Sequence, residues 1–126
     1  MSFISADCDN LKKINDLYGH IVGDEYIRMS ATMLRNVLGS SATLIRMGGD
    51  EFLAILPDTD ERKTAEYMEQ LQKHEKMFSI RNRTLSVSLG ACTMHEPSGS
   101  FKEFIAISDT EMYRNKKARK AREAQE

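Results

Sequence analysis

The sequence predicts an α+β domain of the ferredoxin-like class, in which helices pack on a mixed, largely antiparallel sheet. The chain of 126 residues alternates strand-like and helix-like segments in the order β-α-α-β-β-α-β-α. This order is typical of a split βαβ sheet. No internal repeat or linker divides the chain, which holds only two prolines. Because a chain of this length buries roughly two-thirds of its unfolded surface, residues 1–126 are expected to form one domain without a structural metal or disulfide bond.

The first third of the chain is expected to form one strand and two helices. The strand covers residues 3–7, and Asp9 is placed to cap a short helix that runs to Tyr18. A second helix is expected to begin near residues 23–24, because apolar residues then recur at helical spacing up to residue 38. Gly39 follows that helix as its left-handed stop.

The rest of the chain is expected to supply a hairpin, a strand and two more helices. Residues 44–47 and 52–56 flank a glycine-containing connection, as in a tight hairpin. A helix follows to about residue 74, with capping residues at 58–60, and a short extra strand is possible near residues 78–80. The remaining segments are an alternating strand over residues 84–92 and a long last helix that begins with the capping box Ser100 and Glu103.

The composition excludes several classes of protein. No apolar run approaches the ~18 residues of a membrane span, and the first residues lack the pattern of a signal peptide. We therefore expect a cytoplasmic chain that makes no membrane contact. Cys8 and Cys92 stand far apart without a partner motif, so both are expected to be reduced and buried. The six cations between residues 114 and 122 lack interleaved tryptophan, and the pI is about 6.3, so nucleic acid is not an expected partner.

Two acidic clusters are candidates for a metal site. Asp7 and Asp9 lie at the carboxyl end of the first strand, where open sheets commonly place ligands, although this cluster alone is better explained by a helix cap at Asp9 and a solvated strand end at Asp7. Asp50 and Glu51 lie in the hairpin connection. If the first strand of the hairpin pairs with residues 3–7, Asp50 comes toward Asp7. Three carboxylates there would suit Mg²⁺, whose coordination substrate phosphates usually complete.

Glycines and lysines add a possible phosphate site. Gly48 and Gly49 would let a ligand approach the backbone closely, although a plain turn explains them equally well. Lys116 and Lys120 lie one turn apart on the last helix and are placed to bind phosphate oxygens. A solvated helix end, favoured by the helix dipole, is the alternative.

Together these residues stand in an order that resembles the GGDEF family of diguanylate cyclases. The resemblance rests on Asp7-x-Asp9-x-Leu11-Lys12-x-x-Asn15-Asp16-x-x-Gly19-His20-x-x-Gly23-Asp24, on Gly48-Gly49-Asp50-Glu51-Phe52, on Ser88-Leu89-Gly90 and on Asp109-x-x-Met112-Tyr113-x-x-Lys116. It spans nearly the whole chain. It implies the nucleotidyl-cyclase and polymerase-palm type of ferredoxin-like fold.

The resemblance also implies a reaction and a role for each site residue. Two GTP molecules, one held by each subunit of a transient homodimer, would condense to cyclic di-GMP and release two pyrophosphates. Asp50 and Glu51 would be catalytic. The metal ligands for Mg²⁺ or Mn²⁺ would be Asp7, the Cys8 carbonyl, Asp50 and Glu51. The substrate-binding residues would be Asn10, Leu11 and Lys12 at the phosphates, Asn15 and Asp24 at guanine, Gly48 and Gly49, and Lys116 and Lys120 at the terminal phosphates.

The chain departs from the family pattern in four places. It begins in the first strand, without the usual helix and Asp-x-Leu-Thr-Gly-Leu-x-Asn-Arg segment, so an N-terminal sensory or regulatory domain is expected in the full-length protein. Residues 39–42 replace an Arg-x-x-Asp product-inhibition motif, so feedback through that site is not expected. Leu11 stands for the usual Phe, and Lys120 for a common Arg. The alternative function is a catalytically silent module that binds GTP or another nucleotide.

Overall fold

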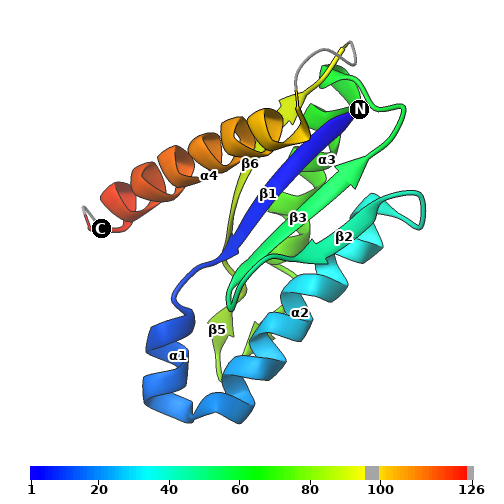
Figure 1. The fold of residues 1–126 in the computed structure, drawn as a ribbon. Helices are drawn as coiled ribbons and strands as arrows, with labels where there is room; N and C mark the ends of the chain where they lie inside the picture. Colours follow the sequence, from blue (N-terminus) through cyan, green and yellow to red (C-terminus); the bar gives the residue numbers. More distant parts are fainter. Residues whose placement is uncertain (96–99, 125–126) are drawn as a thin grey trace.

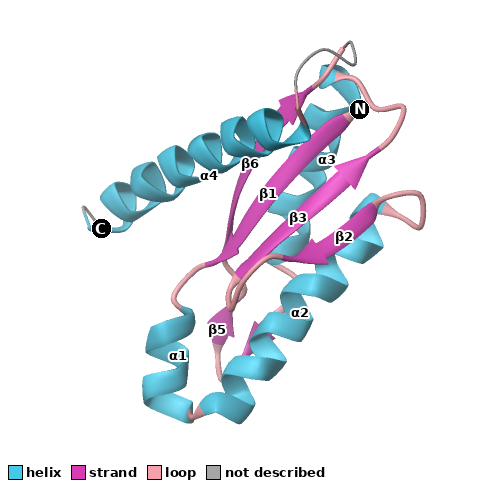
Figure 2. Ribbon diagram, in the orientation of Figure 1, coloured by secondary structure: helices cyan, strands magenta, loops and turns pink. Residues whose placement is uncertain are grey.

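The computed structural model describes residues 1–95 and 100–124, and the elements follow in nearly the predicted order (Figures 1 and 2). Among these residues, no helix is both long enough and apolar enough to cross a membrane. The helices are α1 (Leu11–Tyr18), α2 (His20–Leu38), α3 (Glu61–Glu75) and α4 (Phe101–Ala124). The strands are β1 (Ser2–Cys8), β2 (Thr43–Arg46), β3 (Glu51–Leu56), β4 (Ser79–Ile80), β5 (Arg83–Thr84) and β6 (Val87–Thr93).

The main sheet has four strands in the order β2-β3-β1-β6, and each of its pairings is antiparallel. β3 lies between β1 and β2, and β1 lies between β3 and β6, so two split βαβ units interlock as in a ferredoxin-like fold. The hairpin prediction is wrong in one respect. The second strand of the hairpin, β3, pairs with β1, whereas β2 is at the edge. β2 follows α2 at the edge of the sheet, and the chain then turns back through the tight hairpin, so the returning strand β3 lies between β2 and β1.

The two faces of the sheet are covered by different helices (Figure 1). Alternate residues of β1 point to opposite faces. Phe3 packs on Phe101 and Phe104 of α4, whereas Ile4 belongs to the apolar cluster shared with α2 and α3. On the α4 face Ser5 and Ser108 share a hydrogen bond of 2.7 Å. The apolar cluster on that face is therefore smaller than the one on the opposite face, and polar groups interrupt it.

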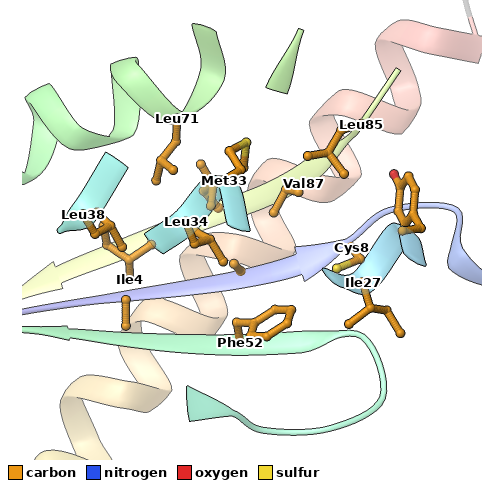
Figure 3. Packing of buried hydrophobic residues seen from close by; sticks show 14 of the residues in the cluster. Ile4, Cys8, Ile27, Met33, Leu34, Leu38, Phe52, Leu71, Leu85 and Val87 are labelled. Carbon is orange, nitrogen blue, oxygen red and sulfur yellow. The ribbon is translucent and has the colours of Figure 1, made fainter. Parts of the chain in front are cut away.

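The main core lies between the sheet and helices α2 and α3. Figure 3 shows its buried side chains converging from the strands and from both helices. Its fully or nearly fully buried members include Ile4, Cys8, Met33, Leu34, Leu38, Leu71, Leu85 and Val87. Burying a side chain of this size contributes about 1.5–3 kcal/mol, so this layer holds the sheet rigid beneath the loops that follow it.

Four local predictions need correction. Asp9 does not cap α1, because the residue at the cap is Asn10 and the Asp9 carboxylate is buried in other contacts. The second helix begins at His20 rather than near residue 23. The strand over 84–92 is split into β5 and β6, because Leu85 donates to the Phe78 carbonyl while Ser86 accepts from the Asp9 amide. Both cysteines are free, but only Cys8 is buried.

Candidate active site

The site lies where β1 ends beside the hairpin turn. Asp7 pairs in register with Glu51 on β3 and with Ser88 on β6, so their side chains share the face covered by α4. The Cys8 amide donates a hydrogen bond of 2.8 Å to the Asp50 carbonyl. The expected approach of the hairpin to Asp7 is therefore present, although β3 produces it instead of β2.

Asp7 is a buried carboxylate with one unsatisfied oxygen. The residue is 2% exposed, and Lys116 donates to its Oδ2 at 2.7 Å. Its Oδ1 is buried and has no hydrogen-bond partner among the described residues. Burial raises the pKa of Asp7 to about 6; Lys116 opposes this rise, and the nearby Asp50 adds to it. A cation beside Oδ1 would remove the cost of ionising this group.

A cavity of about 490 Å³ opens beside these carboxylates. It brings together seven of the residues that the sequence predicted, from the loop after β1, the hairpin turn and α4. These residues are Cys8, Asn10, Leu11, Lys12, Asp50, Lys116 and Lys120. Lys13, Asp16 and Leu17 of α1 also line it and had not been predicted. Lysines from two helices therefore face one space next to Asp7 and Asp50.

The first turn of α1 forms one wall of this cavity. Asn10 adopts the left-handed conformation, with φ 64°, and its side chain makes no capping bond to the helix. The first backbone N–H groups of a helix lack partners within that helix, and the helix dipole favours an anion beside them. Leu11 and Lys12 belong to this first turn, and both line the cavity.

Glu51 does not join the other two carboxylates. Its Oε1 accepts a hydrogen bond from the hydroxyl of Tyr113 on α4, and this contact raises the pKa of the tyrosine. Over residues 1–95 and 100–124, no three His, Cys, Asp or Glu side chains gather closely enough to hold a metal ion. The three carboxylates predicted from the sequence are thus not gathered into one set among these residues, and Glu51 has the Tyr113 hydroxyl as its partner.

The two turn glycines lie in the open. A Cβ added to Gly48 or Gly49 would meet no atom within 4 Å. The Arg46 side chain folds back on the turn and donates to the carbonyls of both glycines, at 3.1 and 2.7 Å. The space beside the two glycines is therefore free for a ligand, and Arg46 of β2 holds the turn in place.

The two residues expected at guanine lie away from the cavity, at the junction of α1 and α2. Asn15 is half-buried and Asp24 is exposed, and neither lines the cavity. The Asn15 amide lies where a Cβ on Gly23 would stand, 1.7 Å from its Oδ1. The absence of a side chain at Gly23, the residue before Asp24, thus leaves room for the Asn15 amide.

One buried polar cluster was not predicted from the sequence. Arg119 of α4 forms ion pairs with Asp9, at 3.1 Å, and with Glu75 at the end of α3, at 2.7 Å. Ser86 and Ser88 complete it with hydrogen bonds to Asp9. The alternating small residues of 84–92 indicated that another element packs closely on one face of this strand. They did not indicate which residues do so, because Asp9, Glu75 and Arg119 come from other elements.

The donors present fit a divalent metal ion. Asp7, Asp50 and the Cys8 carbonyl offer only oxygen, the ligand type that Mg²⁺ prefers. The unsatisfied Oδ1 of Asp7 is the structural feature that calls for a cation. Lys116 compensates only the other oxygen of the carboxylate.

Known proteins share both the sequence pattern and the fold. The family described as "Diguanylate cyclase, GGDEF domain" matches residues 1–122. A probable diguanylate cyclase, DgcC of Escherichia coli K12, is 33% identical over 122 residues, which cover 93% of this chain and 32% of that protein. Diguanylate cyclase VdcA of Vibrio cholerae is 32% identical over 93 residues, covering 74% of this chain and 27% of that protein. The chain thus spans about a third of the length of these curated relatives.

The solved structures agree. The active GGEEF domain of a diguanylate cyclase from Vibrio cholerae superposes with a TM-score of 0.84 at 28% identity, covering 93% of this chain and 76% of that one. The GGDEF domain of DgcB from Caulobacter crescentus, solved in complex with c-di-GMP, gives 0.84 at 25% identity and covers 93% and 72%. Given a family match over residues 1–122 and a fold shared with these domains, the chain belongs to the GGDEF domain family of diguanylate cyclases.

Proposed function

We propose that this chain is a catalytic domain that condenses two molecules of GTP into cyclic di-GMP and releases two pyrophosphates. One observation carries the proposal. The buried carboxylate of Asp7, with an unsatisfied oxygen, stands beside Asp50 at the wall of a cavity that four lysines line from two helices. Carboxylates that bind metal and lysines that bind phosphate are the two groups that a nucleoside triphosphate requires.

The cavity would hold the triphosphate. The backbone N–H groups of Asn10, Leu11 and Lys12 would donate to phosphate oxygens at the start of α1. Lys116 and Lys120 would contact the terminal phosphates as point charges. Lys116 already binds Asp7, so one ammonium would link the carboxylate to the phosphates.

The metal site would use Asp7, the Cys8 carbonyl, Asp50 and Glu51. A bound Mg²⁺ or Mn²⁺ supplies Lewis-acid stabilisation of the charge that builds on the reacting phosphate. Glu51 would leave the Tyr113 hydroxyl to take part. Asp50 would accept the proton of the ribose 3′-hydroxyl. The 3′-oxygen then attacks the α-phosphorus of the partner subunit's GTP in line, and pyrophosphate departs as the P–O bond to it breaks.

Asn15 and Asp24 would recognise guanine. The Asp24 carboxylate accepts two N–H groups from the Watson–Crick edge of guanine, whereas adenine offers an acceptor at N1 and is repelled. One good base contact is worth about 1–3 kcal/mol. The Asn15 amide occupies the space that a side chain at Gly23, the residue before Asp24, would fill, and this supports the role.

Each subunit would hold one GTP, so catalysis would need a transient homodimer. An N-terminal sensory or regulatory domain would control that encounter in the full-length protein. The regulatory part of this proposal is motivated by two solved structures of the same fold: one is the diguanylate cyclase SiaD with its activator SiaC from Pseudomonas aeruginosa, and the other contains the coiled coil and GGDEF domain of DgcB. Because GTP is an intracellular nucleotide, we place the reaction in the cytoplasm.

The test is a product analysis. The chain is incubated with GTP and Mg²⁺ or Mn²⁺ over a range of protein concentrations, and the nucleotides are separated by chromatography. We expect cyclic di-GMP and pyrophosphate at a ratio of about 1:2, with a rate that rises as the square of protein concentration. Asp7→Asn and Asp50→Asn should each lower the rate by at least about 100-fold. Asp58→Asn, on an exposed loop, is the matched control.

A different result would identify the alternative function. If GTP binds but no pyrophosphate forms at any protein concentration, the domain is a nucleotide-binding module without turnover. If GTP does not bind, the proposal is wrong altogether. Equilibrium dialysis with GTP separates these two outcomes.

A further inference from the structure

Arg119 lies on α4 between Lys116 and Lys120, yet its side chain turns away from the cavity that those lysines line. It is instead held by protein acceptors. One guanidinium nitrogen donates to Asp9 Oδ2 at 3.1 Å, to Ser86 Oγ at 2.8 Å and to the Val87 carbonyl at 3.2 Å. The other nitrogen donates to Glu75 Oε1 at 2.7 Å.

The groups around Arg119 are buried and fully partnered. Asp9 is 4% exposed and Glu75 is 8% exposed. Ser88 donates to both oxygens of Asp9, and the Val87 amide donates to the second oxygen of Glu75 at 3.1 Å. One cation thus compensates two buried anions. A buried charge that lost this partner would remain uncompensated, which is costly in a low-dielectric environment.

This cluster ties together the two segments that face the phosphates. Asp9 immediately precedes Asn10, whose left-handed turn starts α1, and the Asp9 carbonyl accepts from the Tyr26 hydroxyl of α2 at 3.0 Å. Arg119 is adjacent to Lys120 and less than one turn beyond Lys116. The ion pair between Asp9 and Arg119 therefore sets the distance between the loop after β1 and the lysine-bearing turn of α4.

A row of polar pairs joins β1 to α4 in register. Ser5 meets Ser108, Asp7 meets Lys116, and Asp9 meets Arg119. Of these six residues, only Lys116 lines the cavity. The pair Asp9–Arg119 is the last of the row, and neither residue lines the cavity.

We propose that Arg119, with Asp9 and Glu75, is a positioning element that holds the loop at Asn10–Lys12 and the turn at Lys116–Lys120 at the separation a triphosphate requires. This inference rests on the proposed function for its ligand. Arg119 itself touches no substrate. Its planar fork serves four acceptors at once, which a lysine ammonium with three donors cannot do.

The free protein provides the first test. Hydrogen exchange is measured on the wild-type chain, on Arg119→Gln and on Arg114→Gln, an exposed control on the same helix. We expect Arg119→Gln to raise amide exchange both at residues 10–13 and at residues 114–122, while Arg114→Gln leaves residues 10–13 unchanged. Unchanged exchange at residues 10–13 in Arg119→Gln overturns the inference. This readout needs no nucleotide.

The second test separates positioning from simple loss of folded protein. A smaller folded fraction lowers apparent kcat and leaves KM unchanged, whereas displaced phosphate contacts raise KM. We expect Arg119→Gln to raise KM and the Kd for GTP by roughly 10- to 100-fold, with Arg119→Lys between it and the wild type. Glu75→Gln, which removes one anion and keeps an acceptor for Arg119 but loses the acceptor of the Val87 amide, should give a smaller rise. A fall in kcat at constant KM and Kd refutes the positioning role.

Failure of the proposed function would look different. If the wild-type chain binds no GTP, the proposed function is wrong. The exchange experiment alone then decides whether Arg119 holds residues 10–13 to the turn at 116–120. If the wild-type chain binds GTP and Lys116→Ala weakens binding while Arg119→Gln does not, the positioning role is wrong and the proposed function stands.

Discussion

Gly90 determines how closely α4 approaches the sheet, and replacing it tests the packing of the whole α4 face. A Cβ built on Gly90 would stand 2.1 Å from the Met112 amide nitrogen, 2.4 Å from the Ser108 carbonyl oxygen and 2.7 Å from the Met112 Cα. All three atoms are backbone atoms of α4. No rotation of a side chain can relieve such contacts, so Gly90→Ala must push the helix away from β6.

The size of the effect follows from these distances. Ordinary contact begins near 3.4 Å, so the closest approach requires a shift of about 1.3 Å. Overpacking of a core typically costs about 1–3 kcal/mol. The shift would also stretch the hydrogen bond from Asn115 to the Leu89 carbonyl and the one between Ser5 and Ser108. We therefore expect the free energy of unfolding to fall by about 3 kcal/mol or more, which lowers Tm by about 10 °C in a domain of this size.

Chemical and thermal unfolding, followed by circular dichroism, measure this change. Gly48→Ala is the matched control, because its added Cβ meets no atom within 4 Å. It should alter the free energy of unfolding by less than about 0.5 kcal/mol. A Gly90→Ala protein that melts within about 2 °C of the wild type would show that α4 does not lie on β6 as described, and would also undermine the placement of Lys116, one turn further along.

Two further predictions concern the site. Burial raises the pKa of Asp7 from 3.8 to about 6, so between these pH values the folded chain keeps a proton that the unfolded chain has lost, and stability falls as the pH rises from about 4 to about 6. With EDTA present, the stability of Asp7→Asn relative to wild type should therefore increase by up to about 3 kcal/mol between pH 4 and pH 8; urea titrations that give the same difference at every pH would contradict this. The second prediction concerns Gly23→Ala, whose added Cβ would strike the Asn15 side chain rather than backbone. We expect it to weaken GTP binding about tenfold with stability changed by less than about 1 kcal/mol, and Asp24→Ala to reduce the preference for GTP over ATP. Isothermal titration with both nucleotides measures these effects, and an unchanged Kd for GTP in both variants would rule out guanine recognition here.

The sequence by itself determined the elements and most of the cavity. Apolar periodicity located the helices and the hairpin, because that pattern reports directly which side of an element is buried. Chain order placed Asp7 at a strand end and Asp50 in a turn. The family motif then assigned Asn10, Lys12 and Lys116 to one site, and the structure places all three around a single cavity.

Only the tertiary structure decided which partners the polar groups take. The pairing of β1 with β3 instead of β2, the contact of Tyr113 with Glu51 and the burial of Asp9 beside Arg119 each join residues more than 40 positions apart. A local pattern gives Asp9 the same capping propensity whether or not an arginine stands opposite it. The choice depends on the burial of charge between packed elements, which exists only once α4 has closed over the sheet.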